Sequence, residues 1–182
     1  MIDEKVLVKQ LQDKKTQNKA FKELIDLYKE RLYWHIRKMV ISHDDTDDVL
    51  QNTFIKIFRN IGSFKGNSKL YSWIYRIATN EAITHINKKA IMQRIDSDEI
   101  RQRMVENLEA DVYFEGDEIQ LKLQKALVRL PQKQQLVFNM RYFDEMKYED
   151  ISDILETSVG GLKASYHHAR KKIETYLKEE SL

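Results

Sequence analysis

The residues best suited to chemistry lie near the C-terminal end, where cationic and polar side chains follow a pair of glycines. The stretch VGGLKASYHHARKKI, residues 159–173, carries Lys163, Ser165, His167 and Arg170. Cations and hydroxyls in such a run bind phosphate oxygens and the edges of bases. The stretch therefore favours nucleic-acid binding, and the plainer alternative is an amphipathic helix that happens to begin with a glycine-containing turn.

No pattern for catalysis or metal binding occurs along the chain. The 182 residues include no cysteine, which excludes disulfides, thiolate metal sites and a cysteine nucleophile. His167 and His168 are adjacent, so on a helix their rings would point about 100° apart and could not easily share one metal ion. Phosphate-binding loops and nucleophile elbows are also missing. We therefore expect a protein that is no enzyme and that needs no cofactor and no metal.

The composition predicts an all-α protein. One proline and five glycines in 182 residues leave long uninterrupted segments that favour helices. No apolar run approaches the ~20 residues that a membrane span needs, and the first residues do not resemble a signal peptide. We expect a soluble cytoplasmic protein without membrane insertion.

Charge divides the chain into three parts. Residues 1–94 have a net charge of +7, residues 95–118 have −7, and residues 119–182 have +2. The middle part lacks the apolar periodicity of a helix over most of its length, and we expect no more than one loose helix in it. This pattern predicts two small helical domains, 1–92 and 118–182, joined by an acidic linker, 93–117.

Apolar residues at steps of three and four predict the helices of both domains. In the first domain they fall at 18–41, 46–60 and 69–89, with N-cap candidates at Asp44 to Thr46 and at Ser68. In the second domain a helix begins at 118, and the next follows Pro131. The short helix 147–155, the turn ETS and the basic helix 159–177 then form a helix-turn-helix pattern.

Gly160 and Gly161 stand where the last helix must begin, although glycine costs a helix interior roughly 1 kcal/mol relative to alanine. Ser158 can cap this helix, which places both glycines in its first turn. Amides there have no partner within the helix and can point at a phosphate, with no side chain in the way. We therefore expect a slim leading edge that enters a major groove about 12 Å wide.

A second candidate site lies in the stretch from Phe64 to Arg76, which mixes aromatic and cationic residues around a loop. Aromatic rings stack on unpaired bases while cations follow the backbone of a single strand. A base extruded from a duplex needs a similar pocket. The alternative is that Trp73 and Tyr75 belong to the hydrophobic core.

Both candidate sites fall in stretches that resemble a known family. DDVLQNTFIKIF and SFKGNSKLYSWIYRIATNEAI resemble region 2 of the extracytoplasmic-function (ECF) sigma factors of the sigma-70 family. LVRLPQKQQLVFNMRYFDEMKYEDISDILETSVGGLKASYHHARKKI resembles their region 4, and the likeness covers about residues 20–177. It implies a bacterial RNA polymerase sigma factor that directs promoter recognition, promoter melting and transcription initiation.

The resemblance also implies a role for individual residues. It assigns binding of the polymerase core to Asp48, Gln51, Asn52 and Phe54. The minus-ten element is met by Phe64, Lys65, Asn67, Ser68, Tyr71, Trp73, Tyr75, Arg76 and Asn80. The minus-thirty-five element is met by Ser158, Val159, Gly160, Lys163, Ala164, His167, His168, Arg170 and Lys171. Many relatives carry threonine in place of Gly161 and arginines in place of Ser165 and His168, which implies different base preferences here.

The implied partners are the RNA polymerase core, through its beta-prime clamp helices, promoter DNA in double- and single-stranded form, and an anti-sigma factor. One alternative is a helix-turn-helix regulator that does not bind core polymerase. This alternative does not explain the polar DDVLQN face. A second alternative is an interaction module, such as a mimic of an anti-sigma factor, which would not need the aromatic and basic loop.

Overall fold

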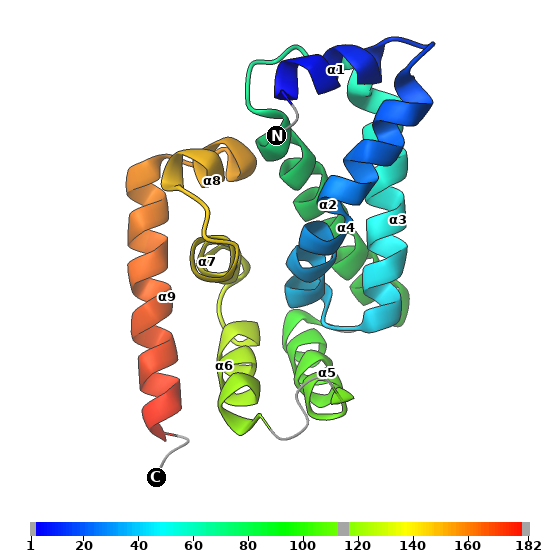
Figure 1. The fold of residues 1–182 in the computed structure, drawn as a ribbon. Helices are drawn as coiled ribbons and strands as arrows, with labels where there is room; N and C mark the ends of the chain where they lie inside the picture. The colour runs from blue at the N-terminus through cyan, green and yellow to red at the C-terminus, as the bar shows by residue number, and fades with distance from the viewer. Residues whose placement is uncertain (1–2, 113–116, 180–182) are drawn as a thin grey trace.

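The structure is a computed structural model that describes residues 3–112 and 117–179, and within these ranges it contains helices and no strand. The all-α prediction is confirmed. Figure 1 shows two groups of helices side by side, α1 to α4 in one group and α6 to α9 in the other, with α5 beneath the first. None of the described helices is both long enough and apolar enough to cross a membrane.

The N-terminal group packs three long helices around one core, with a short helix across their end. Its helices are α1 (Glu4–Gln12), α2 (Gln17–Val40), α3 (His43–Asn60) and α4 (Leu70–Gln93). The core side chains include Leu24, Leu32, Ile36, Ile57 and Ile74, none of which has measurable exposure. The three long predicted helices are therefore present, and α1 is an addition that the periodicity did not indicate.

The two predicted N-caps in this group are wrong. Helix α3 begins one turn earlier, where the Ser42 hydroxyl accepts a hydrogen bond of 3.3 Å from the Asp45 amide. Helix α4 has no side-chain cap from its own segment, because the Leu70 amide donates instead to Glu4 Oε1 at 2.9 Å. A carboxylate from α1 thus satisfies the orphan amide that Ser68 was expected to satisfy.

The C-terminal group contains the expected helix-turn-helix. It consists of α6 (Glu118–Val128), α7 (Gln132–Phe138), the π-helix η3 (Asn139–Phe143), α8 (Tyr148–Leu155) and α9 (Val159–Glu179). Glu156 ends α8 in the left-handed conformation, with φ of 51°. The buried side of α9 carries Leu162, Ala169 and Ile173.

The acidic segment holds more order than its composition predicted. Helix α5 (Ser97–Glu109) begins with a capping box in which Asp96 and Glu99 exchange side-chain and backbone hydrogen bonds. Its Val105 and Leu108 are buried in a small cluster with Ile41 and Val128, so α5 contacts both groups. Residues 113–116 of the predicted linker lie outside the described residues.

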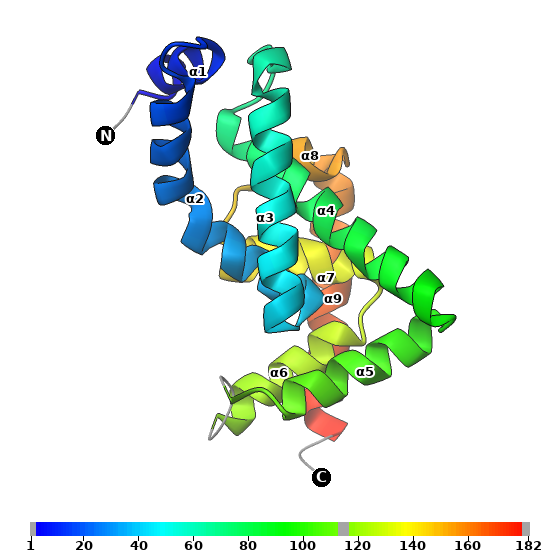
Figure 2. The same cartoon turned by 90° about the vertical axis from the view of Figure 1, so that its right-hand side faces the viewer.

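The two groups are docked against each other. One cluster of buried apolar side chains runs from Ile74 and Ala78 of α4 to Ile151 and Ile154 of α8. Figures 1 and 2 both place α8 next to the first half of α4. The molecule therefore has a shared core across the boundary between its two predicted domains, in addition to a core inside each group.

Candidate nucleic-acid interface

The polar side of α3 is open to solvent. Asp48, Gln51 and Asn52 are exposed on it, whereas Phe54 is half-buried and meets the Phe21 ring edge-on, with 6.3 Å between ring centroids. The opposite side of the helix buries Val49, Thr53 and Ile57. Ile55 is 44% exposed one turn beyond Gln51 and Asn52, so an apolar side chain extends this polar face. The arrangement suits contact with another macromolecule.

The loop before α4 brings aromatic rings together. Phe64 and Trp73 are half-buried, and their ring centroids lie 5.3 Å apart. The carbonyl of Phe64 accepts a 2.8 Å hydrogen bond from Gln12 Nε2, which ties the loop to α1. Gly66 has φ of 74°, a conformation in which a side chain would be strained. The loop therefore has a defined shape, and it presents the exposed Lys65 and Asn67 beside an aromatic pair.

Tyr71 and Tyr75 lie deeper than a base-stacking role would require. Their ring centroids are 4.6 Å apart, Tyr71 is half-buried, and Tyr75 is 3% exposed. Burial, together with the Asp144 carboxylate, raises the pKa of both phenols well above the ordinary value, so both stay neutral. In this arrangement Tyr75 is a core residue, which agrees with the alternative interpretation of the sequence.

Helix α8 occupies the cationic side of α4. Lys69 Nζ lies 2.6 Å from Asp150 Oδ1, and this carboxylate raises the pKa of the Lys69 ammonium. Arg76 donates to the carbonyl of Asp153, and its Nη1 lies 3.1 Å from Glu156 Oε1. Carboxylates and a carbonyl thus take the places beside these two cations that phosphate oxygens could take. Asn80 and Ser68 keep exposed or partly exposed side chains.

The leading edge of α9 is as slim as expected. The Ser158 hydroxyl accepts a 3.2 Å hydrogen bond from the Gly161 amide, which confirms the predicted cap. A methyl group at Gly160 would meet nothing within 4 Å, so the space in front of this residue is open. A methyl group at Gly161 would lie 3.2 Å from the Ser158 oxygen and would crowd the cap.

Beyond its first turn, α9 presents a cationic face to solvent. Val159 is half-buried, whereas Lys163, Ala164, His167, His168, Arg170 and Lys171 are exposed. Lys163 Nζ lies 5.8 Å from the centre of the Tyr148 ring of α8, and Arg170 pairs with Glu174 at 3.3 Å. A helix with one buried apolar stripe and one exposed cationic face has the form of a recognition helix.

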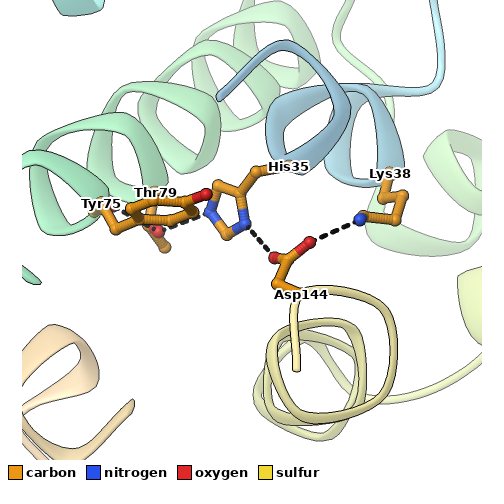
Figure 3. Close-up of polar contacts among 5 residues, drawn as sticks. All are labelled: His35, Lys38, Tyr75, Thr79 and Asp144. Carbon is orange, nitrogen blue, oxygen red and sulfur yellow. Dashed lines mark hydrogen bonds and ion pairs between the residues drawn. The ribbon is translucent and has the colours of Figure 1, made fainter. Parts of the chain in front are cut away.

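A charged cluster that periodicity could not reveal lies where the two groups meet (Figure 3). His35 is 1% exposed, and its Nδ1 lies 2.8 Å from Asp144 Oδ2 while its Nε2 lies 2.9 Å from Thr79 Oγ1. Lys38 Nζ lies 2.6 Å from the other Asp144 oxygen. Burial alone would raise the pKa of Asp144, but the hydrogen bonds and charges of His35 and Lys38 outweigh it and lower the pKa.

Sequence reasoning missed two residues of interest. His35 lies on the apolar side of α2, and its partner is 109 positions away, so no local signal identifies the pair. Ile55 could have been found, because it follows the polar DDVLQN stretch on the exposed side of α3. Among the residues that the structure describes, no group of three or more His, Cys, Asp or Glu side chains could hold a metal ion.

Two sequence families match the chain, one for each group of helices. Residues 24–91 match Sigma-70 region 2, and residues 120–173 match Sigma-70, region 4. The ECF RNA polymerase sigma factor SigW of Bacillus subtilis (strain 168) is 31% identical, covering 92% of this chain and 94% of that protein. The RNA polymerase sigma-H factor of Pseudomonas aeruginosa is 28% identical, covering 87% and 86%.

Two solved structures share the fold. CnrH, in complex with the cytosolic domain of CnrY, is similar with a TM-score of 0.71 and 18% identity over 97% of both chains. The sigma factor RpoE from Bartonella quintana, in complex with the anti-sigma factor NepR, has a TM-score of 0.67 and 23% identity. That match covers 88% of this chain and 98% of the other. At these identities the two structures support the arrangement of helices alone.

Proposed function

The chain belongs to the extracytoplasmic-function sigma factors of the sigma-70 family, which act in transcription initiation, and we propose how its parts divide that work. Residues 1–92 act as region 2, which binds core polymerase and the minus-ten element. Residues 118–182 act as region 4, which binds the minus-thirty-five element, and residues 93–117 link them. The positions of the two family matches support this division.

Core polymerase binds to the exposed side of α3. Asp48, Gln51 and Asn52 offer carboxylate and amide groups to a partner, and Phe54 supports the helix from behind. Ile55 adds a partly exposed apolar side chain to the same side. Polar groups around an apolar centre form an interface that is specific and excludes water, and the clamp helices of the beta-prime subunit are the partner we infer.

The loop from Phe64 to Lys69 and the start of α4 hold the opened strand of the minus-ten element. Lys65 and Asn67 are exposed beside the Phe64–Trp73 pair, as stacking and backbone contact require. Tyr71, Arg76 and Asn80 continue this surface along α4. Binding energy to the melted form drives melting, so this chain needs no catalysis of its own.

Helix α9 enters the major groove at the minus-thirty-five element. Its open leading edge at Gly160 lets the backbone approach the DNA, and Lys163 and His167 follow on the exposed face. Ser158, Val159, Ala164 and His168 complete the contact, and Arg170 and Lys171 follow the phosphates. The cationic face supports this assignment because phosphate contacts dominate affinity.

Reading both elements requires the two groups to separate. The two elements are separate stretches of the promoter, and each base pair between them adds about 3.4 Å to the distance that the chain must span. In the docked form, however, Lys69 and Asp150 touch across α4 and α8. The linker allows separation, and its tether raises the effective concentration of the second contact once the first has formed.

An anti-sigma factor is the further partner we infer. The two structurally similar proteins are described as complexes with CnrY and with the anti-sigma factor NepR. The same surfaces of α3, α4 and α9 would be the ones to cover in this chain. We place the protein in the cytoplasm, where core polymerase and promoter DNA are available.

One observation carries the proposal: a single chain exposes both the polar side of α3 and the cationic side of α9. Co-elution with purified core polymerase tests the first of these surfaces. We expect the wild-type chain to co-elute, and Asp48→Ala with Gln51→Ala to weaken binding by tenfold or more, because loss of a few central contacts dominates an interface.

Asp13→Ala with Gln10→Ala is the matched control. Gln10 on α1 and Asp13 at its C-cap are both exposed, have the same types and the same spacing of three, and should leave core binding unchanged. A helix-turn-helix regulator would not co-elute with core polymerase at all. Equal binding by both double variants would place the polymerase contact elsewhere on the chain.

A further inference from the structure

The contacts of His35 call for a hydrogen on each ring nitrogen, which is one more than a neutral ring has. The Thr79 hydroxyl has one hydrogen, which it donates to the carbonyl of Tyr75 at 2.8 Å. The 2.9 Å contact between Thr79 Oγ1 and His35 Nε2 therefore needs a hydrogen on Nε2. On the other side of the ring, ionised Asp144 can only accept, so the 2.8 Å contact needs a hydrogen on Nδ1.

A neutral ring has one protonated nitrogen, so it leaves either the contact with Asp144 or the contact with Thr79 without a hydrogen. With Nδ1 unprotonated, its lone pair would face a carboxylate oxygen at 2.8 Å. With Nε2 unprotonated, Thr79 would have to donate to it, and its oxygen would lie 2.8 Å from the Tyr75 carbonyl oxygen with no hydrogen between them. The two contacts therefore favour a His35 ring that is protonated at both nitrogens in the docked form.

The groups around the ring keep the charge in place. Asp144 faces it from the end of η3, and Lys38 binds the second oxygen of the same carboxylate. On α4 the Tyr75 ring lies 4.9 Å from His35, and burial raises the pKa of this phenol so that it adds no negative charge. Arg31 adds a cation on α2. Asp144 is the anion that contacts the ring (Figure 3), and Glu30 and Glu145 line the cavity beside the cluster.

Asp144 reaches His35 only when the two groups of helices are docked. His35 and Thr79 belong to α2 and α4, whereas Asp144 follows η3. A cavity of about 860 Å³ lies between the groups and is lined by Lys38, Tyr75 and Asp144, so solvent can approach the cluster. Once the groups separate, the ring loses its anionic partner.

We propose that docking of α6–α9 onto α2 and α4 takes up a proton on His35, so that falling pH favours the docked form and rising pH favours the separated form. A histidine without a carboxylate partner is about half neutral at pH 6.5. Above that pH, docking must bind a proton that the separated form lacks. One-proton linkage then weakens docking by up to about tenfold for each pH unit.

The consequence for transcription rests on the function proposed above. In the docked form Lys69 and Arg76 are engaged by α8, so the surface for the minus-ten element is partly covered. Proton release from His35 would therefore uncover it. The His35 latch, defined by His35, Thr79, Asp144 and Lys38, would make the availability of this sigma factor depend on pH.

Two measurements on the full chain test the latch without polymerase or DNA, so their outcome does not depend on the proposed function. Long-range proton–nitrogen NMR correlations of the ¹⁵N-labelled chain report both ring nitrogens, and His35→Gln identifies the signals by their loss. We expect both nitrogens to be protonated in the docked chain at pH 7.5, where a ring without a carboxylate partner is mostly neutral. A neutral tautomer there would overturn the proposal.

The second measurement follows the distance between the groups by energy transfer. The chain has no cysteine, so Lys22→Cys and Lys178→Cys, at exposed positions of α2 and α9, can carry dyes. We expect the docked fraction to fall as pH rises from 6 to 8.5, and His35→Gln to remove this dependence. Circular dichroism at each pH checks that the helices persist.

His85→Gln is the matched control, because His85 Nε2 lies 3.1 Å from Asp45 on α3 and takes no part in docking. It should keep the pH dependence of the wild-type chain. A wild-type docked fraction that does not change with pH, or an unchanged slope in His35→Gln, would contradict proton-coupled docking. If His35→Gln fails to fold, the protonation state from NMR decides alone.

Discussion

Arg76 and Glu156 form an ion pair between the two halves of the chain, with 3.1 Å between Nη1 and Oε1. Arg76 is one of the cations assigned to the minus-ten element, and Glu156 opens the turn of the helix-turn-helix. Arg76, which is proposed to contact the minus-ten element, is thus held by the helix-turn-helix, which is proposed to contact the minus-thirty-five element. Docking and DNA binding compete for the same side chains.

Glu156→Gln should shift the molecule toward the separated form by a small factor. The Glu156 side chain is 74% exposed, and exposed ion pairs contribute about 0.2–1 kcal/mol, which corresponds to at most about fivefold. The energy-transfer assay at low and high salt measures this, and the effect should shrink at high salt. Glu174→Gln, whose pair with Arg170 lies within α9, should leave docking unchanged.

Gly160→Ala should stabilise the fold and weaken binding to a minus-thirty-five duplex. Its methyl group has free space, and replacing glycine at a compatible position adds about 0.4–1 kcal/mol to the free energy of unfolding. Thermal unfolding and duplex titration measure the two effects. Gly161→Ala should stabilise less, because its methyl group meets the Ser158 oxygen at 3.2 Å. Unchanged DNA affinity of Gly160→Ala would count against entry of this edge into the groove.

Lys163→Ala should weaken duplex binding and make it less sensitive to salt. A lysine that contacts phosphate contributes about one unit to the slope of log affinity against log salt concentration. Titration of the full chain at several salt concentrations gives this slope. Lys178→Ala removes a cation from the far end of the same helix and should change the slope less. An identical slope in both variants would mean that Lys163 does not meet the DNA.

Acid should destabilise the docked form through Asp144. Its pKa is lowered in the docked form, so its contribution is complete above the ordinary value of about 3.9 and is lost as pH falls through the docked-state pKa. Docking should therefore strengthen from pH 8 to pH 6 and weaken again below about pH 4. Asp144→Asn should lose about 1–3 kcal/mol of docking free energy at pH 6, where a charged hydrogen bond is removed.

Energy transfer across this pH range tests the expectation for Asp144. A docked fraction that keeps rising below pH 4 would show that Asp144 is not ionised in the docked form. Asp45 provides an internal comparison, because Lys89 and His85 overcome its burial and lower its pKa, but it lies within the N-terminal group. Protonation of Asp45 should lower the stability of the N-terminal group. It should not change the docked fraction as long as that group stays folded.

The sequence predicted those features that local rules determine. Steps of three and four located the long helices, and the turn at 156–158 with its Ser158 cap located the helix-turn-helix. It did not predict contacts between distant residues. At the start of α4, for example, Glu4 accepts the hydrogen bond of the Leu70 amide, where Ser68 was expected as the cap. The weak periodicity of the middle segment indicated no more than one loose helix, whereas the Asp96–Glu99 capping box is a local signal for the start of α5.

The interface between the groups had no signal in the sequence. His35 looks like one more residue on the buried side of α2, and Asp144 looks like a turn residue after η3. Their roles follow only from docking, which depends on the three-dimensional meeting of α2, α4 and η3. The roles of the residues assigned to polymerase and promoter contact remain predictions that the experiments above address.

The most direct test of the central claim is run-off transcription with purified core polymerase on a library of promoter templates. Adding this chain to core enzyme should start transcripts at defined positions, downstream of a shared pair of elements. Asp48→Ala with Gln51→Ala should need at least tenfold more protein to give the same amount of transcript. Initiation no different from that of core enzyme alone, on every template, would contradict the account.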